Sequence, residues 1–128
     1  MRRNQSAGVL CVGCSQRLFQ KLNDRLEQSE LRLLGPLNQE EAVAVCASQG
    51  VALIILDGAS IRGQEWSVAK SFKMMRPTLP IILLGEHKSG TRLPDGVEAV
   101  VSLNHLDRLP STIRRLLNPS SRKATSGQ

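Results

Sequence analysis

Aromatic residues are almost absent from this sequence. They make up 2% of its 128 residues, with one tryptophan, two phenylalanines and no tyrosine. Hydrophobic residues nevertheless make up 41%, so the core must consist mainly of leucine, isoleucine, valine and alanine. The shortage also argues against a single-stranded nucleic-acid surface, because such surfaces interleave aromatic side chains with basic ones.

Blocks of one charge and long apolar runs are missing as well. The net charge is +6, but lysine and arginine are dispersed, which favours a solvated basic surface and does not choose between nucleic acid, acidic proteins and membranes as partners. No apolar run approaches the roughly 18–20 residues of a membrane helix, and the polar start does not resemble a signal peptide. With only three cysteines, an odd number, we expect a protein of the reducing cytoplasm that does not bind membranes.

Five short apolar runs predict β-strands. Each is bounded by Gly, Pro or polar residues and lacks polar alternation, which is typical of strands buried on both faces of a parallel sheet. Gly35-Pro36 is expected to end the second strand. The predicted strands cover residues 8–13, 31–34, 51–56, 80–85 and 97–103.

Four amphipathic segments predict helices, three of them between these runs and one after the last run. Ser15 is a plausible N-cap for the first, Asn38 opens the second, and Trp66 is expected to pack on the third. The last covers residues 109–117. The segment 86–96 is interrupted by glycine and proline and predicts no helix.

Alternating strands and helices predict an α/β domain over residues 8–117, with flexible termini at 1–7 and 118–128. We expect a doubly wound parallel sheet with right-handed crossovers and helices on both faces. Ligand sites in such sheets lie at the carboxyl ends of the strands. The residues expected there are Gly13, Cys14, Asp57, Gly85 and Leu103.

Residues 8–117 resemble the receiver domain of bacterial response regulators. The resemblance rests on Val-Leu-Cys-Val at 9–12, Leu-Ile-Ile-Leu-Asp at 53–57 and Arg-Pro-Thr-Leu-Pro-Ile-Ile-Leu-Leu at 76–84. It implies a five-stranded sheet in the order 2-1-3-4-5. In the family a helix joins strands 4 and 5, but the interrupted segment 86–96 predicts that this helix is short or missing here. The resemblance also makes Asp57 the candidate phospho-acceptor.

The resemblance implies further site residues, and most of them are replaced. Receivers hold Mg²⁺ with two acidic residues after strand one and with the acceptor aspartate. Gly13 and Cys14 stand where that acidic pair is expected, and Gly85 stands where a Ser or Thr hydroxyl is expected. Leu103 stands at the lysine position, with Ser102 as the nearest hydroxyl.

Shifting the alignment does not restore these groups. No acidic residue precedes Asp24, and no lysine lies between Lys88 and Lys123. One carboxylate is a weak Mg²⁺ site, so we expect no cofactor and interpret Asp57 as a strand-end carboxylate bonded to backbone amides. Sequences of this kind are called pseudo-receivers, and the resemblance implies that they bind partners without phosphate-driven switching.

We therefore expect a non-enzymatic interaction module. Its partner would be a histidine kinase, another regulator, an output protein or a second copy, bound through the fifth strand, the segment 86–96 and the last helix. The sheet face beside the missing helix is expected to be poorly covered. No helix-turn-helix is present, so direct DNA binding is not expected. The first alternative is a working phosphorelay receiver phosphorylated on Asp57.

The second alternative is a thiol redox switch through Cys11 and Cys14, which form a Cys-x-x-Cys motif. Cys11 should be buried in the strand and Cys14 should lie at its end, so their side chains need not face each other. We expect two separate buried or half-buried thiols. A zinc site is not expected, because the spacing of the candidate ligands matches no known pattern. Those candidates are Cys11, Cys14, Cys46, His87 and His105.

Overall fold

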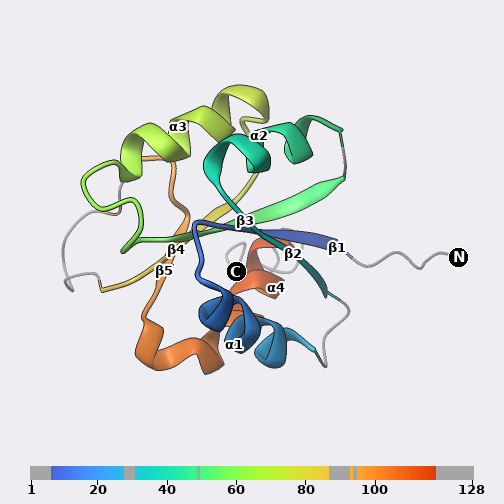
Figure 1. Ribbon diagram of the computed structural model, residues 1–128, viewed down its shortest axis with the longest axis vertical. Coiled ribbons are helices and arrows are strands. Elements are labelled where there is room, and N and C mark those ends of the chain that lie inside the picture. The colour runs from blue at the N-terminus through green and yellow to red at the C-terminus, as the bar shows by residue number, and fades with distance from the viewer. Residues whose placement is uncertain (1–6, 28–30, 49, 87–92, 94, 118–128) are drawn as a thin grey trace, which may run out of the picture.

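The chain folds as one parallel sheet between two layers of helices (Figure 1). The computed structural model describes residues 7–27, 31–48, 50–86, 93 and 95–117. The strands are β1 (Ala7–Val12), β2 (Leu31–Leu37), β3 (Val51–Asp57), β4 (Ile81–Leu84) and β5 (Ala99–Val101). The helices are α1 (Gln16–Leu26), α2 (Gln39–Ser48), α3 (Glu65–Met75), the 3₁₀ helix η1 (Leu103–Arg108) and α4 (Leu109–Leu117). None of the described helices is long and apolar enough to cross a membrane.

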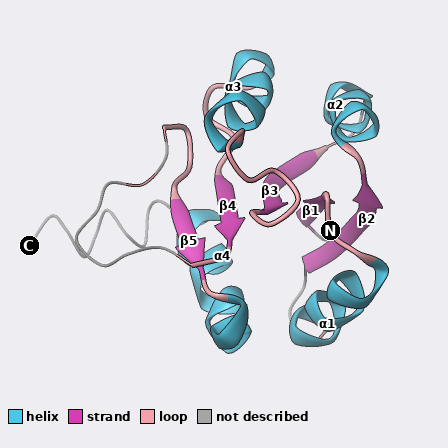
Figure 2. Cartoon of the chain, turned by 60° about the vertical axis from the view of Figure 1, so that its left-hand side comes forward, coloured by secondary structure: helices cyan, strands magenta, loops and turns pink. Residues whose placement is uncertain are grey.

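The sheet order is β2-β1-β3-β4-β5 and every described pairing is parallel, which confirms the predicted fold class. Helices α2 and α3 cover one face, and α1 and α4 cover the other (Figure 2). Side chains of a strand alternate between these faces, so each central strand contributes to two cores. Val9, Leu53 and Ile55 pack towards α1 and α4, whereas Leu10 and Ile54 pack towards α2 and α3.

Side-chain caps begin the first two helices as the sequence predicts. The hydroxyl of Ser15 accepts a hydrogen bond from the Leu18 amide at 3.1 Å. Asn38 and Glu41 form a reciprocal capping box: the Glu41 amide donates to the Asn38 side chain at 2.8 Å, and the Asn38 amide donates to the Glu41 carboxylate at 2.9 Å. These caps place the two helix starts directly after β1 and β2.

The predicted end of the second strand was wrong. Strand β2 continues through Gly35 and Pro36 to Leu37, with a shift of register against β1. It is an edge strand, where a proline is tolerated because its missing N–H need not face another strand. Gly35 has a φ of 121°, and a Cβ there would lie 2.8 Å from the Cys11 carbonyl oxygen.

Two further expectations need correction. Trp66 does not pack into the core: it lies outside the buried stripe of α3, is 50% exposed and has the Lys70 ammonium 4.5 Å from its ring centre. The last strand is shorter than predicted, because the chain enters η1 at Leu103 after the three residues of β5. The sequence does not predict η1, which is kinked at His105.

The connection from β4 to β5 contains no helix among its described residues, as predicted. The sheet face beside it is nevertheless covered, contrary to expectation. Leu83 and Val97 are each only 7% exposed, and Val100 is half-buried. The returning chain lies against α3, so that a Cβ on Gly96 would be 3.2 Å from the Cβ of Ala69.

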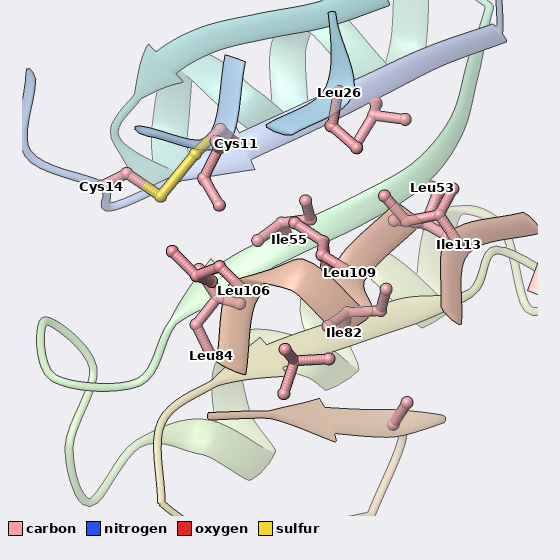
Figure 3. Packing of buried hydrophobic residues seen from close by; sticks show 14 residues of the cluster. Cys11, Cys14, Leu26, Leu53, Ile55, Ile82, Leu84, Leu106, Leu109 and Ile113 are labelled. Carbon is pink, nitrogen blue, oxygen red and sulfur yellow. A yellow bond between two sulfur atoms is a disulfide. The ribbon is translucent and has the colours of Figure 1, made fainter. Parts of the chain in front are cut away.

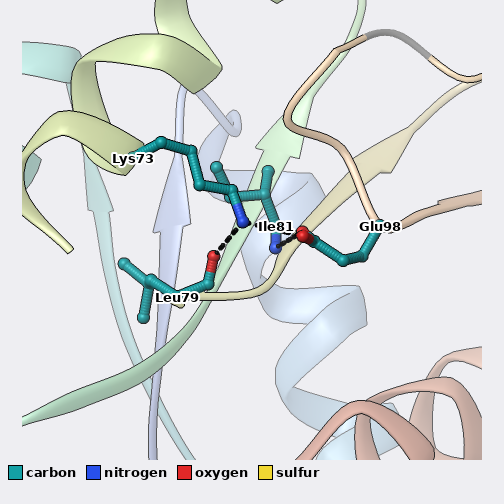
Figure 4. A network of polar contacts seen from close by, with 4 residues as sticks. All are labelled: Lys73, Leu79, Ile81 and Glu98. Carbon is teal, nitrogen blue, oxygen red and sulfur yellow. Dashed lines mark hydrogen bonds and ion pairs between the residues drawn. The ribbon is translucent and has the colours of Figure 1, made fainter. Parts of the chain in front are cut away.

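A polar network holds this returning chain in place (Figure 4). The Lys73 ammonium of α3 lies 2.7 Å from the Glu98 carboxylate and 2.7 Å from the Leu79 carbonyl oxygen. The other carboxylate oxygen of Glu98 accepts from the Ile81 amide at 2.8 Å, and the Glu98 amide donates to the Ile81 carbonyl at 2.9 Å. Glu98 thus joins the entry to β5 to both β4 and α3.

Replacing Glu98 should destabilise the fold. Glu98→Ala leaves the buried Ile81 amide without its acceptor and removes the carboxylate partner of Lys73, which keeps its bond to the Leu79 carbonyl. We therefore expect the free energy of unfolding to fall by about 1–3 kcal/mol in urea denaturation. Glu98→Gln keeps one acceptor and should cost less, about 1 kcal/mol. Glu27→Gln removes the same charge from the exposed end of α1 and should change stability by less than about 0.5 kcal/mol. Equal effects at positions 98 and 27 would contradict the role of the network.

Candidate functional site

The carboxyl ends of the strands gather the predicted site residues at one edge of the sheet. Backbone hydrogen bonds hold the strand ends together: the Gly58 amide donates to the Leu84 carbonyl at 2.8 Å, and the Gly85 amide donates to the Val101 carbonyl at 3.0 Å. The residues that follow or end these strands are Gly13, Cys14, Asp57, Gly85, Ser102 and Leu103. The topology therefore brings together the positions that the sequence singled out.

Asp57 ends β3 as a half-buried carboxylate. One of its oxygens accepts a hydrogen bond from the Ala59 amide at 3.1 Å. Its main-chain carbonyl accepts from both the amide and the hydroxyl of Ser60, at 3.1 and 3.0 Å. The carboxylate thus supports its own turn, which is the arrangement expected of a strand-end aspartate.

The turn after β1 depends on Gly13. This residue has a φ of 78°, in the left-handed region that favours glycine, and its amide donates to the Leu37 carbonyl at 2.8 Å. A Cβ on Gly13 would collide with the Ser60 hydroxyl. The β1 turn and the Asp57 turn are therefore in direct contact.

The expectation of two separate thiols at this turn was wrong. Cys11 and Cys14 are joined by a disulfide (Figure 3). The left-handed Gly13 turns the chain back, so that the two Cα atoms lie 6.3 Å apart, within the usual range for a disulfide. The Cys-x-x-Cys spacing is compatible with a disulfide, but the conformation of Gly13 decides whether the two side chains meet.

The ends of β4 and β5 present few polar groups. Gly85 has no side chain, and a Cβ added there would meet no atom within 4 Å. The Ser102 hydroxyl donates to the Glu86 carboxylate at 3.0 Å and accepts from the Asn104 amide at 3.1 Å, so it caps η1. Leu103 is 41% exposed. Sequence reasoning missed Glu86, although its place directly after the fourth strand is a usable signal; His87 lies outside the described residues.

Sequence reasoning also missed a shallow hollow beside β5. It has a volume of about 440 Å³ and lies between the strand, η1 and α4. The side chains of His105, Arg108 and Arg115 line it, together with the Glu86 carboxylate and hydroxyls that include that of Ser111. The sequence carried no clear signal for this hollow, because Arg108 ends η1 whereas Arg115 belongs to α4.

Comparisons with solved structures place this fold among response-regulator receiver domains. The signal receiver domain of an HD domain-containing protein from Pseudomonas fluorescens matches with a TM-score of 0.76 and 16% identity, covering 98% of this chain and 96% of that one. A receiver protein from Sinorhizobium medicae gives 0.69 and 16%, covering 89% and 96%. The RcsB response regulator of Salmonella typhimurium gives 0.72 and 17%, covering 89% of this chain but 61% of that one. No protein-family model and no curated protein matches the sequence.

The residues at the strand ends do not fit the magnesium ion that this fold implies. Mg²⁺ requires a near-octahedral set of oxygen ligands, supplied in part by carboxylates. Gly13 has no side chain, the Cys14 sulfur is bonded to Cys11, and one oxygen of Asp57 already accepts from an amide. Among the described residues, no three His, Cys, Asp or Glu side chains form a group that could hold a metal ion.

Gly13→Ala should be more costly than an equivalent change elsewhere. An alanine at this φ is strained by about 1–2 kcal/mol, and the Ser60 hydroxyl must also give up its bond to Asp57, worth about 1 kcal/mol. Gly63 has a similar φ of 83° with open space around it, so Gly63→Ala should show the strain alone. Chemical denaturation measures both losses.

The extra loss should disappear in a Ser60→Ala background, because the colliding hydroxyl is then absent. Equal losses for Gly13→Ala and Gly63→Ala in the wild-type background would show that the β1 turn and the Asp57 turn are not coupled.

Proposed function

We propose that this chain is a receiver-like signalling module that acts through protein–protein interaction in the cytoplasm, without metal-dependent phosphorylation and without enzymatic activity. The observation that carries the proposal is the donor set at the strand ends. The fold provides the position for a phospho-acceptor at Asp57, but the oxygen ligands expected after β1 are replaced by Gly13 and by Cys14, which is part of a disulfide.

Electrostatics gives the physical reason. An acyl phosphate on Asp57 would bring negative charge to a half-buried position, where a charge needs a nearby opposite charge. Receivers of the kind that this chain resembles use Mg²⁺ and a lysine. Here Leu103 follows β5, and no lysine or arginine occurs from Ser102 to Asp107. The phosphorylated state would therefore be poorly stabilised.

Phosphorylation should fail in a direct test. The full chain is incubated with acetyl phosphate and Mg²⁺, and its intact mass is compared with that of Asp57→Asn. We expect no phosphoryl mass on either protein, because Asp57 lacks the charge compensation described above. An added phosphoryl mass on the wild-type chain that is absent from Asp57→Asn would establish the alternative, a phosphorelay receiver.

The partner surface that we propose is formed by β5, η1 and α4. Strand β5 lies at the edge of the sheet, and the basic hollow lies beside it. Arg108, Arg114 and Arg115 of residues 99–117 outnumber the nearby acidic residues, which are Asp107 in this range and Glu86 in the lining of the hollow. Such a surface is complementary to an acidic protein, which is the partner we favour, whereas a second copy would bring like charges together. A histidine kinase, another regulator or an output protein would fit this description.

Reversing the charge of this surface should weaken the binding of an acidic chain. We expect Arg108→Glu/Arg115→Glu to weaken binding of a labelled polyglutamate peptide at low salt by more than tenfold, because both arginines line the hollow. Arg17→Glu/Arg25→Glu, on the exposed side of α1, makes the same change in net charge and should have less than a twofold effect. Fluorescence anisotropy measures both.

Equal losses of peptide binding in the two variants would mean that net charge alone drives binding. That result would refute β5, η1 and α4 as the partner surface. Tighter binding of a DNA duplex than of the peptide, lost in the same arginine variant, would favour nucleic acid over a protein partner. Sedimentation velocity of the unliganded chain tests self-association, which the charge argument disfavours.

A further inference from the structure

We infer that Cys11 and Cys14 are a reversible redox pair whose disulfide holds the turn between β1 and α1. This goes beyond the proposed interaction function, because it adds a chemical modification site at the edge of the sheet where the phospho-acceptor position lies. The inference rests on the geometry of the pair, on its burial and on the contacts that the turn makes.

The two cysteines are unequally accessible. Cys11 is fully buried in β1, within the core that includes Ile55 and Leu22, whereas Cys14 is 8% exposed at the rim of the sheet. Cys14 also immediately precedes Ser15, the N-cap of α1, where the helix dipole favours a thiolate. Cys14 is therefore the sulfur that an external reagent reaches, and Cys11 is the resolving sulfur behind it.

A low-molecular-weight disulfide such as oxidised glutathione can oxidise the pair in two thiol–disulfide exchange steps. The Cys14 thiolate attacks one sulfur of the glutathione disulfide, which forms a mixed disulfide and releases one glutathione thiolate. The Cys11 thiolate then attacks the Cys14 sulfur, which forms the Cys11–Cys14 bond and releases the second glutathione. Each cysteine loses one proton, the protein is oxidised by two electrons, and one glutathione disulfide becomes two glutathione thiols.

A purely structural role explains this disulfide poorly. It closes a loop with a sequence separation of three, and a short loop constrains the unfolded chain far less than a long one. The aliphatic core on both faces of the sheet is already continuous around it. In the reducing cytoplasm that we propose, a persistent disulfide would be unusual, whereas a transient regulatory one is the common case.

Reduction should change the turn, because two thiol sulfurs cannot stay at bonding distance. Cys11 is held inside β1, so the displacement falls on Cys14 and on the start of α1. The Cys14 sulfur lies 3.9 Å from the Val12 carbonyl oxygen, which can accept a hydrogen bond from the Cys14 thiol after reduction. Gly13 contacts Ser60, and Ser60 bonds Asp57, so the change reaches the Asp57 turn.

The third cysteine provides an internal reference. Cys46 lies on α2 in the core on the opposite face of the sheet, so it cannot exchange with the pair. Burial raises the pKa of the Cys46 thiol, and the nearby Arg76 offsets only part of this increase. Because its pKa is raised, the thiol stays protonated at neutral pH. It should therefore remain a free thiol under conditions that oxidise the pair.

The test equilibrates the full chain with glutathione buffers from fully oxidised to fully reduced, quenches with acid and alkylates in denaturant. Intact mass then counts free thiols. We expect one alkylated cysteine, Cys46, in oxidising buffers and all three in reducing buffers, with a single transition between them. Cys46→Ala should keep the transition, and Cys14→Ser should abolish it. Circular dichroism checks that each variant is folded. If Cys14→Ser does not fold, Cys11→Ala replaces it as the variant that should lack the transition.

Three free thiols at every buffer ratio would refute the disulfide. One free thiol even in fully reduced glutathione would make it an inert structural bond and would equally overturn the inference. Hydrogen exchange tests the coupling: the amides of Gly13, Leu18 and Ser60 should exchange severalfold faster in the reduced chain. Identical exchange in both states would refute the connection to the Asp57 turn.

Discussion

Burial of the two central strands on both faces is the constraint on which the rest of this structure depends. Every side chain of β1 and β3 that enters a core is apolar, so polar chemistry is confined to the strand ends. Parallel pairing then brings those ends to one edge of the sheet, and the short connections that follow them become neighbours. In this chain the described residues at that edge include the carboxylates of Asp57 and Glu86, one disulfide and several glycines, so the architecture found in receiver domains here offers a different set of groups.

Much of the architecture could be predicted because local sequence patterns determine where its strands and helices lie. The buried strands appear as uninterrupted apolar runs, and the helix starts at Ser15 and Asn38 carry side-chain caps that form as expected. The order of the strands in the sheet was predicted from the resemblance to receivers, because the sequences of the individual strands do not determine it. The end of β2 was misplaced because glycine and proline usually end a strand, whereas an edge strand tolerates them.

What escaped prediction depends on contacts between distant residues. The face beside the missing helix is covered because Gly96 approaches α3 and Glu98 joins β4 to Lys73, and no local pattern reports such contacts. The sequence placed Gly13, Asp57 and Gly85 at strand ends, where the structure has them, but the pairing of Cys11 with Cys14 required the left-handed backbone of Gly13. The hollow could not be predicted without the fold, because its lining combines Gly85 and Glu86 after β4 with residues of β5, η1 and α4.

The two edges of the sheet also bear on how the protein behaves at high concentration. An exposed strand edge is a template for pairing with other chains, and long, flat edges promote fibrillar aggregation. One edge here carries Pro36, which cannot donate a backbone hydrogen bond, and the other consists of the three residues of β5 beside arginine side chains. Both features limit the pairing of this aliphatic-rich chain with the sheet of a neighbouring molecule and so protect it from aggregation through its sheet edges.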